Sequence, residues 1–148
     1  MENLIEVKNL AVSYFTYAGE VHSVRGVTFD VKSGKTTAIV GESGCGKTVT
    51  AKSLMGLIHK PGKILEGSQI LFEGKDIMSA DAKKRRKLYG SDIALIPQNP
   101  MTSFDPSCKL GNQLAETYRI HNKSSVKAAQ NAVFEAMHRA GLEQCKAI

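Results

Sequence analysis

Apolar and polar residues alternate along the first third of the chain, and this pattern predicts two strands. From Leu4 to Tyr14 the apolar residues fall mostly at every second position, with charged residues among those between them. Segment 22–31 repeats the alternation, and the lysine, serine and glycine after it predict a turn. Segment 15–20 lies between the two strands, carries aromatic residues and a glycine, and predicts a loop.

The middle of the chain combines short apolar runs with one helical pattern. Segment 35–40 (KTTAIV) predicts a β-branched strand, and segment 49–58 has apolar residues at the spacing of a helix. Segment 67–77 predicts a strand with a glycine turn, as one arm of a hairpin, and segment 79–89 predicts a charged surface helix. Segment 92–97 predicts a buried strand that stops at its proline. Strands therefore dominate the first part of the chain.

Helical spacing replaces strand alternation in the last third of the chain. Segments 110–121 and 124–142 both predict helices, and the second places its apolar residues on one face. Ser124 or Ser125 is a suitable N-cap for that helix, and Gly141 is suitable to end it. Together with the strands before them, these helices predict an α/β fold.

The composition is ordinary for a globular protein. The 148 residues, 42% of them apolar, suit one domain, and no apolar run approaches the ~18 residues of a membrane span. The N-terminus has no features of a signal peptide. Three widely spaced cysteines without a C-x-x-C pair indicate neither a disulfide framework nor a metal site. A reducing, cytoplasmic setting is therefore the default expectation, and we do not expect the chain to cross a membrane.

The formal net charge of +6 suits an anionic ligand, and the dense basic run is residues 83–87. We interpret this run as the solvated face of a surface helix. A nucleic-acid interface would need aromatic residues or further basic clusters nearby, and only Tyr89 is present. A nucleic-acid-binding protein is therefore a minor alternative, and we expect no nucleic-acid partner.

Residues 41–48, GESGCGKT, fit the phosphate-binding pattern G-x-x-x-x-G-K-[ST], and we call them the glycine loop. A phosphate cradle needs backbone N–H groups turned inward, and glycines tolerate the backbone angles and the close approach that this requires. The helix expected after the loop adds the positive end of its dipole. Lys47 is placed to reach the β- and γ-phosphates of ATP, and the Thr48 hydroxyl is placed to bind Mg²⁺. The expected nucleotide-binding residues of this loop are Gly41, Glu42, Ser43, Gly44, Cys45, Gly46, Lys47 and Thr48.

Cys45 lies among these inward-facing N–H groups, an environment that favours a thiolate. We interpret it as a tolerated small residue rather than as a redox switch. Alkylation of its thiol is nevertheless expected to block nucleotide binding.

The glycine loop, with the residues ESG inside it, resembles that of the ATP-binding subunits of ABC transporters, in the branch that imports di- and oligopeptides or nickel. The segments IEVKNLAVSY, GEVHSVRGVTFDVKSGKTTAIVGESGCGKT and IPQNPMTSFDP resemble that branch in order and spacing. GNQLAETYRIH and AVFEAMHRAGL resemble the opening helices of its helical subdomain. The resemblance spans essentially the whole chain. It implies a P-loop NTPase core of ABC type with an N-terminal antiparallel β subdomain in residues 1–97, and the Gln98 loop with the first helices of the helical subdomain in residues 98–148.

The resemblance implies two further site residues. Gln98 directly follows the last expected strand, where the family has a glutamine that approaches Mg²⁺ and the attacking water and whose loop contacts the membrane subunit. Pro97 departs from the larger apolar residue that the family often has there. The family also stacks an aromatic residue on adenine, and Tyr17 is best placed for this role. Tyr14 and Phe15 remain alternatives, because each of the three side chains offers a π-face.

The resemblance also indicates which motifs of the family are missing from these 148 residues. The family has an apolar strand ending in Asp-Glu, a switch histidine after it, and an L-S-G-G-Q-type signature that serves the opposite subunit, and no such motif follows Gln98 here. We therefore expect an incomplete domain, the front part of a longer subunit, which binds ATP and Mg²⁺ but does not hydrolyse ATP by itself. The strand expected at 35–40 would be left without its family neighbour, with backbone groups unpaired. In the full subunit Lys47 and Gln98 are the expected catalytic residues, and Thr48 and Gln98 the expected metal ligands.

The resemblance finally implies an energy-coupling ATPase subunit at the cytoplasmic face of the cell membrane. Its implied partners are integral-membrane permease subunits, a second ATP-binding subunit that is identical or different, and, indirectly, an extracellular substrate-binding protein. The cargo, peptide or nickel, stays open because the residues that choose it lie in partner proteins. The alternative function is a stand-alone nucleotide-binding regulatory module without turnover.

Overall fold

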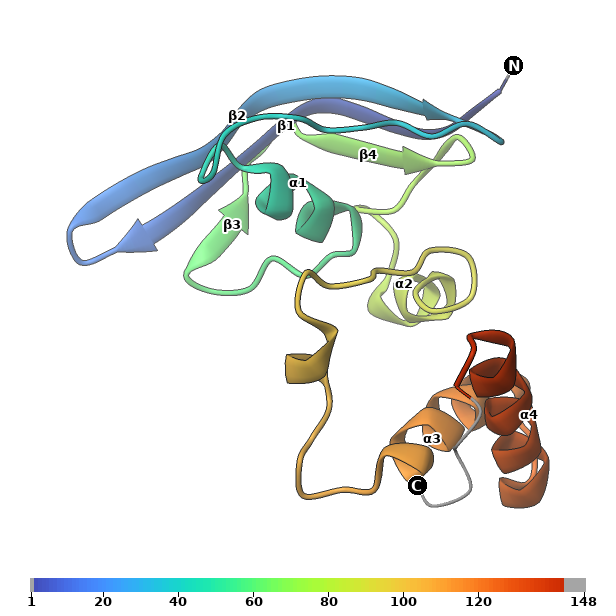
Figure 1. Cartoon of the computed structure of the whole chain (residues 1–148). Coiled ribbons are helices and arrows are strands. Elements are labelled where there is room, and N and C mark those ends of the chain that lie inside the picture. The colour runs from blue at the N-terminus through green and yellow to red at the C-terminus, as the bar shows by residue number, and fades with distance from the viewer. Residues whose placement is uncertain (1, 143–148) are drawn as a thin grey trace. The chain divides into compact units, whose positions relative to one another are not determined.

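The computed structural model describes residues 2–142, which form two compact units divided between Ile93 and Ala94. The first unit combines a sheet with helices, and the described part of the second is helical (Figure 1). The elements of the first unit are β1 (Asn3–Thr16), β2 (Gly19–Lys32), α1 (Lys47–Leu54), β3 (Gly62–Ile64), β4 (Gln69–Phe72), β5 (Lys75–Asp76) and α2 (Ala82–Leu88). Those of the second are the 3₁₀-helix η1 (Pro100–Ser103), α3 (Leu110–Asn122) and α4 (Val126–Arg139).

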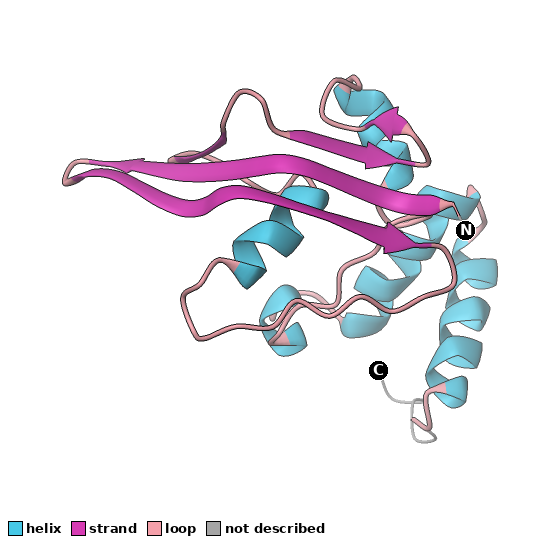
Figure 2. Cartoon of the chain, turned by 90° about the horizontal axis from the view of Figure 1, so that it is seen from above, coloured by secondary structure: helices cyan, strands magenta, loops and turns pink. Residues whose placement is uncertain are grey.

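The sheet is antiparallel in the order β2-β1-β4-β5, and β3 also pairs with β1 (Figure 2). β1 and β2 form a long hairpin whose last pair is Thr16 and Gly19, so that only Tyr17 and Ala18 make the turn. The loop expected over 15–20 was therefore wrong in extent. Gly19 has a φ of 121°, a backbone conformation that glycine adopts without strain, and this lets strand pairing continue to the turn.

A β-bulge decides which side chains of β1 enter the core. Val7 and Leu10 are both fully buried, although their positions differ by three and a regular strand would point them to opposite faces. Asn9 at φ 50° and Gly26 at φ 75° lie where the register of β1 and β2 shifts, and the Asn9 N–H donates to Thr28 Oγ1 at 2.9 Å. The extra residue turns Leu10 inward again, which is why the alternation in the sequence is imperfect.

Side chains from the sheet and from the helices build the core of the first unit. Leu54 of α1 and Leu88 of α2 pack against the buried cluster. α1 also buries two polar residues, and one of them, Ser53, donates its hydroxyl hydrogen to the Val49 carbonyl at 2.8 Å, so its burial leaves it satisfied. The apolar residues of the cluster are Val7, Leu10, Val12, Val24, Ile70, Phe72 and Ile77.

α1 ends at Leu54, short of the end expected at residue 58, and a tertiary contact accompanies this difference. Gly56 has a φ of 60°, which is incompatible with continuing the helix, and its N–H donates to the Ser53 carbonyl at 3.0 Å. The Tyr89 phenol lies against Gly56, so that a Cβ at this position would come within 2.8 Å of Tyr89 Oη. Burial raises the pKa of Tyr89, and the charge of Arg85 partly opposes this.

Two expected strands do not form in the described chain. Segment 35–40 is extended but pairs with no strand of residues 2–142, and Val40 is 89% exposed. In segment 92–97 only Ile93 makes a bridge, to Tyr89, and Ile96 is 90% exposed. Both predictions were therefore wrong, because an extended segment becomes a ladder strand only when a neighbour takes up its N–H and C=O groups.

The helices of the second unit form where the sequence pattern predicts them, and the caps predicted for the last helix form as well. Ser125 Oγ accepts a hydrogen bond from the Ala128 N–H at 3.2 Å and caps α4. Gly141, at φ 80°, follows the end of that helix. Ala115 of α3 and Ala129 of α4 are buried where the two helices pack. Small side chains at these two positions let the helix backbones approach each other.

Substitution of Gly56 tests whether Tyr89 holds the end of α1. Gly56→Ala should lower the free energy of unfolding by about 2 kcal/mol or more, since it adds both left-handed backbone strain and the contact with Tyr89 Oη. Gly74→Ala is the matched control, because Gly74 has a φ of 73° but nothing within 4 Å of its Cβ position, and it should cost only the strain of about 1–2 kcal/mol. In a Tyr89→Phe background the two costs should converge. Urea denaturation measures both, and equal costs in the unmodified background would contradict the contact.

Candidate functional site

The glycine loop connects the extended segment 35–40 to α1, at the end of the first unit where the β1–β2 hairpin projects (Figures 1 and 2). Gly46 has a φ of 92°, and a Cβ there would lie 2.5 Å from the Ser23 carbonyl oxygen of β2 and 3.4 Å from Val24 Cγ2. Gly44 has a φ of 84° with open space around it. Gly46 is thus required by packing against β2 as well as by its backbone angle, whereas Gly44 is required by its backbone angle alone.

Lys47 folds back over the glycine loop. Its ammonium donates to the carbonyl oxygens of Gly41 and Glu42, both at 2.6 Å, and to Cys45 Sγ at 3.6 Å. An ammonium has three donors, and here two meet strong acceptors while the third meets a weak one, sulfur. A phosphate oxygen can therefore take the third donor while the two carbonyls continue to hold the positive charge over the loop.

α1 begins at Lys47, and no side chain of the described residues caps it. Gly46 is the N-cap, has no side chain to accept a hydrogen bond, and is followed by a first turn without acidic residues. The first helical hydrogen bond runs from the Thr50 N–H to the Gly46 carbonyl at 2.8 Å. The positive end of the helix dipole is therefore not neutralised by a carboxylate, an arrangement that suits an anion. Thr48 is exposed in this first turn, where its hydroxyl is available to a cation bound beside the anion.

The remaining residues of the glycine loop form an exposed turn. The Cys45 N–H donates to the Glu42 carbonyl at 3.4 Å, and both side chains are exposed, as is that of Ser43. The Cys45 thiol lies against Gly41, because a Cβ at Gly41 would come within 2.6 Å of Sγ. The loop residues expected to bind nucleotide are thus exposed at positions 41–45 and 48 and half-buried at Gly46 and Lys47.

The three aromatic candidates for adenine stacking differ in how far their side chains are exposed. Tyr17 is at the turn of the β1–β2 hairpin and is fully exposed, and Phe15 is also exposed. Tyr14 packs against the core, and its ring lies 2.8 Å from the Cβ position of Gly62. The assignment of adenine to Tyr17 stays a prediction, with Phe15 as the alternative whose ring is also exposed.

Gln98 is exposed and belongs to the second unit, whereas the glycine loop belongs to the first. It follows the extended segment that ends at Pro97 and precedes η1. Its role as a metal ligand and catalytic residue stays a prediction.

The loop between η1 and α3 is held by a side chain that sequence reasoning missed. Gln113 of α3 accepts a hydrogen bond from the Asp105 N–H at 2.9 Å and donates to the carbonyls of Asp105 and Cys108, both at 3.0 Å. Hydrogen bonds from the Ser107 hydroxyl and N–H lower the pKa of the Asp105 carboxyl. In the sequence Gln113 is only one polar position of a helical pattern, so no local signal reveals this clamp.

Within residues 2–142 no three His, Cys, Asp or Glu side chains gather into a metal site. None of the helices in the described residues combines the length and the hydropathy of a membrane span.

A family model described as ABC transporter matches residues 24–147, a span that runs from β2 through the glycine loop and both described helices of the second unit. The chain belongs to the ABC transporter family. The family expected from the sequence is thereby confirmed.

Relatives of this ABC chain are peptide-transport proteins by name. It is 46% identical over 142 residues to the dipeptide transport ATP-binding protein DppD of Lactococcus lactis subsp. cremoris, covering 95% of this chain and 40% of that protein. It is 44% identical over 139 residues to the oligopeptide transport ATP-binding protein OppD of Bacillus subtilis, covering 94% and 39%. It is 40% identical over 135 residues to the glutathione import ATP-binding protein GsiA of Pectobacterium atrosepticum, covering 87% and 22%. The chain thus spans about two fifths of the length of the first two relatives.

Solved ABC structures confirm the fold class. The chain matches the dimeric post-hydrolysis ATP-binding cassette MJ0796 bound to ADP and Pi with a TM-score of 0.76 and 17% identity, over 95% of this chain and 58% of that one. It matches cbiO1 from Clostridium perfringens, part of the ABC transporter complex cbiONQ, with a TM-score of 0.67 and 24% identity, over 99% and 53%. These likenesses concern the fold: an ABC-type α/β cassette of which this chain covers a part.

The contact between Gly46 and β2 can be separated from the backbone angle by two matched substitutions. Gly46→Ala and Gly44→Ala both add left-handed strain, but only the first also pushes a Cβ into the Ser23 carbonyl of β2. Gly46→Ala should therefore lower the melting temperature by about 5 °C or more beyond Gly44→Ala. Thermal unfolding followed by circular dichroism measures the difference. Melting temperatures that match within error would show that the loop does not rest on β2.

Proposed function

We propose that the chain is the nucleotide-binding part of the ATP-binding subunit of an ABC importer for di- or oligopeptides. The observation that carries the proposal is the placement of the Lys47 ammonium over a glycine loop that opens onto an uncapped helix. The names of the relatives, which cover dipeptides, oligopeptides and glutathione, support small peptides as the cargo rather than nickel.

The proposed ATP site uses three kinds of group from the glycine loop and the start of α1, together with Tyr17 from the β1–β2 hairpin. Lys47 offers its third donor and its charge to the β- and γ-phosphates of ATP. Backbone N–H groups of the loop and of the first turn of α1 surround the phosphate oxygens. Mg²⁺, where bound, supplies charge neutralisation to the phosphates, and Thr48 would hold it from the protein side. Tyr17 would stack on the adenine ring.

Turnover is proposed to need more than these residues. Phosphoryl transfer requires a carboxylate that holds Mg²⁺ and a group that orients the attacking water. No apolar run after Gln98 ends in Asp-Glu within the 148 residues. We expect this stretch of chain to bind ATP without hydrolysing it, with Lys47 and Gln98 acting in catalysis only together with a strand and a signature motif like those of the family.

The proposed setting is the cytoplasmic face of a membrane. The subunit would work with integral-membrane permease subunits and a second ATP-binding subunit, and indirectly with an extracellular substrate-binding protein. We propose that ATP closes the two paired ATP-binding subunits and that the Gln98 loop transmits this motion to the permease. The dimer of MJ0796 and the importer names of the relatives support this setting.

Replacement of Lys47 tests the proposed function. Lys47→Ala should weaken the binding of ATP in the presence of Mg²⁺ by at least about a hundredfold, since it removes a charge-assisted contact worth roughly 3 kcal/mol. Lys52→Ala is the matched control, because Lys52 is an exposed lysine on the same helix and should leave the affinity unchanged. Isothermal titration calorimetry measures both. An unchanged affinity in Lys47→Ala, or no magnesium-dependent binding by the unmodified protein, would refute the proposal.

Alkylation of Cys45 tests the same site from its other side. The thiol lies against Gly41 and next to the Lys47 ammonium, so a bulky adduct should displace Lys47 and reduce ATP binding by at least about tenfold. The reaction is done in a Cys108→Ser, Cys145→Ser background, which removes the exposed Cys108 thiol and the Cys145 thiol, which lies outside the described residues. The same treatment of a further Cys45→Ala variant is the control. Retained ATP affinity after complete modification at Cys45 would contradict the geometry.

A further inference from the structure

Helix α2 carries a dense group of cations that the proposed function does not use. Its sequence, AKKRRKL, contains five consecutive basic residues, 83–87. The Asp81 carboxylate caps the helix by accepting from the Lys83 and Lys84 N–H groups, at 2.6 and 3.3 Å. α2 is thus a formed, capped helix, and its cations are held on a defined surface.

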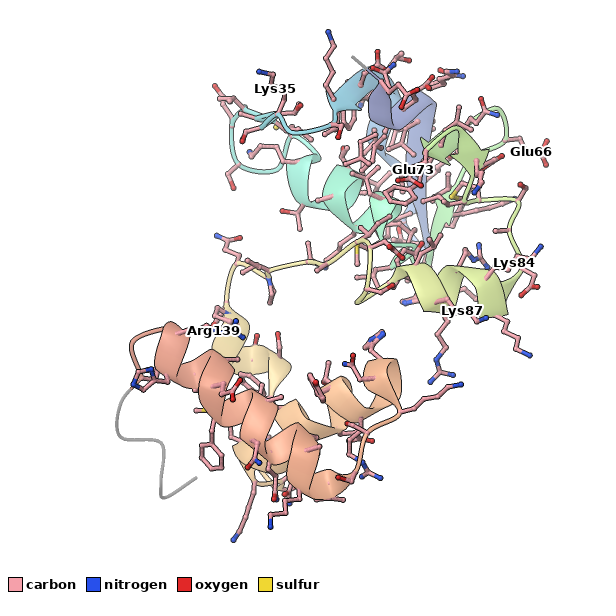
Figure 3. All side chains as sticks on the ribbon, turned by 90° about the vertical axis from the view of Figure 1, so that its right-hand side faces the viewer. Lys35, Glu66, Glu73, Lys84, Lys87 and Arg139 are labelled. Carbon is pink, nitrogen blue, oxygen red and sulfur yellow. The ribbon has the colours of Figure 1, made fainter. Side chains whose placement is uncertain are left out.

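The cations separate cleanly between the two faces of α2. Leu88 packs against the core and the Arg85 guanidinium donates to the Met78 carbonyl at 3.4 Å, so these two side chains mark the face toward the body of the unit. The other four cations are exposed and, at about 100° per residue, occupy one continuous arc of roughly 160° on the opposite face. We call them the basic face: Lys83, Lys84, Arg86 and Lys87. Figure 3 labels two of them on α2, on the far side of the first unit from the β1–β2 hairpin.

No carboxylate of the described residues forms an ion pair with the basic face. Among residues 2–142 Lys8 pairs with Glu6, and His22 Nδ1 lies 3.4 Å from a Glu20 carboxylate oxygen, and both contacts are elsewhere. The nearest carboxylate in the sequence, that of Asp81, is engaged with the backbone N–H groups of α2. The basic face therefore presents four uncompensated positive charges on one turn and a half of helix, which calls for an extended anionic partner rather than a single ion.

We propose that the basic face of α2 docks on the anionic phospholipid headgroups of a membrane surface. Clusters of four or more Lys and Arg on one helix face attract such headgroups, with a contribution from each cation near the surface. A nucleic acid fits less well, because stacking on bases needs an exposed aromatic ring and the neighbouring Tyr89 is half-buried against Gly56. The basic face has cations without aromatic interleaving, which is sufficient for attraction to anionic headgroups but offers no ring for stacking on bases.

This inference rests on the proposed function only in placing the subunit beside a membrane, and it concerns a different part of the molecule. The glycine loop precedes α1, whereas the basic face is on α2. Four charges give weak, salt-sensitive attraction and not permanent anchoring. The basic face would orient a subunit that its permease holds, with α2 toward the headgroups.

Co-sedimentation with vesicles tests the docking. Phosphatidylcholine vesicles with and without phosphatidylglycerol are mixed with the protein at about 0.05 M and about 0.5 M NaCl. The α2 variant replaces Lys83, Lys84, Arg86 and Lys87 by Gln, which keeps helix propensity. The charge-matched control replaces four exposed lysines that lie apart from one another, Lys35, Lys63, Lys75 and Lys127, by Gln.

The unmodified protein should bind the anionic vesicles at low salt and lose this binding at high salt. The α2 variant should bind them at least about tenfold more weakly. The charge-matched control should also bind them more weakly, but the logarithm of its loss of affinity should be less than half that of the α2 variant. Circular dichroism confirms that both variants fold. Equal losses in both variants, or no binding of the unmodified protein to anionic vesicles, would overturn the proposal. Saturable binding to a DNA duplex that the α2 variant loses, with vesicle binding unchanged, would assign the face to nucleic acid instead.

A crossed measurement separates this inference from the proposed function. Lys47→Ala should bind vesicles as the unmodified protein does, and the α2 variant should keep the ATP affinity of the unmodified protein. Loss of ATP binding alone in Lys47→Ala would therefore leave the lipid surface standing, and loss of vesicle binding alone in the α2 variant would leave the nucleotide site standing. A loss of vesicle binding in Lys47→Ala comparable to that of the α2 variant would count against the basic face as the docking surface.

Discussion

The glycine loop lies on β2 through the close approach of Gly46 to the Ser23 carbonyl, and the proposed nucleotide site depends on this contact. Because position 46 has no side chain, the loop backbone lies directly on β2 and α1 begins against the sheet. The same absence leaves α1 without a capping side chain, so the first donors of the helix face the place where an anion would bind. Lys47 then folds onto the loop carbonyls and brings its charge to that place. The missing Cβ of Gly46 thus lets the loop lie on β2 and leaves the first turn of α1 without a capping side chain.

The position of β2 depends in turn on the packing of β1. The bulge at Asn9 turns Leu10 inward, and the resulting row of buried side chains on β1 holds the hairpin over the core. Val24, the neighbour of Ser23, belongs to the buried core cluster of the first unit. Packing of Val24 therefore helps to fix the position of the Ser23 carbonyl, which the glycine loop contacts. Core packing and site geometry are therefore parts of one chain of contacts. A defect in the bulge would reach the loop through β2.

The molecule uses its cations in three different ways. Lys47 donates to two backbone carbonyls, and its charge is concentrated at the short glycine loop, as recognition of a phosphate chain requires. The cations of the basic face are exposed and spread over a convex helix surface, as attraction to a plane of headgroups requires. Arg85 belongs to neither use, because it ties α2 to the Met78 carbonyl. The cations thus have three different uses: Lys47 at the proposed phosphate site, Arg85 in the packing of α2, and the basic face as the proposed docking surface.

The sequence by itself determined the glycine loop, the helices of the second unit with their Ser125 cap, and the ABC family, because each depends on local residue chemistry or on ordered motifs. Features that depend on distant residues were decided by the tertiary structure: the bulge that buries Leu10, the early end of α1 at Gly56 beneath Tyr89, and the Gln113 clamp. Segments 35–40 and 92–97 show the same limit most clearly. Their apolar, β-branched residues favour strands, but strand formation requires a neighbour to accept and donate the backbone hydrogen bonds, and no described segment provides one for them beyond the single bridge of Ile93.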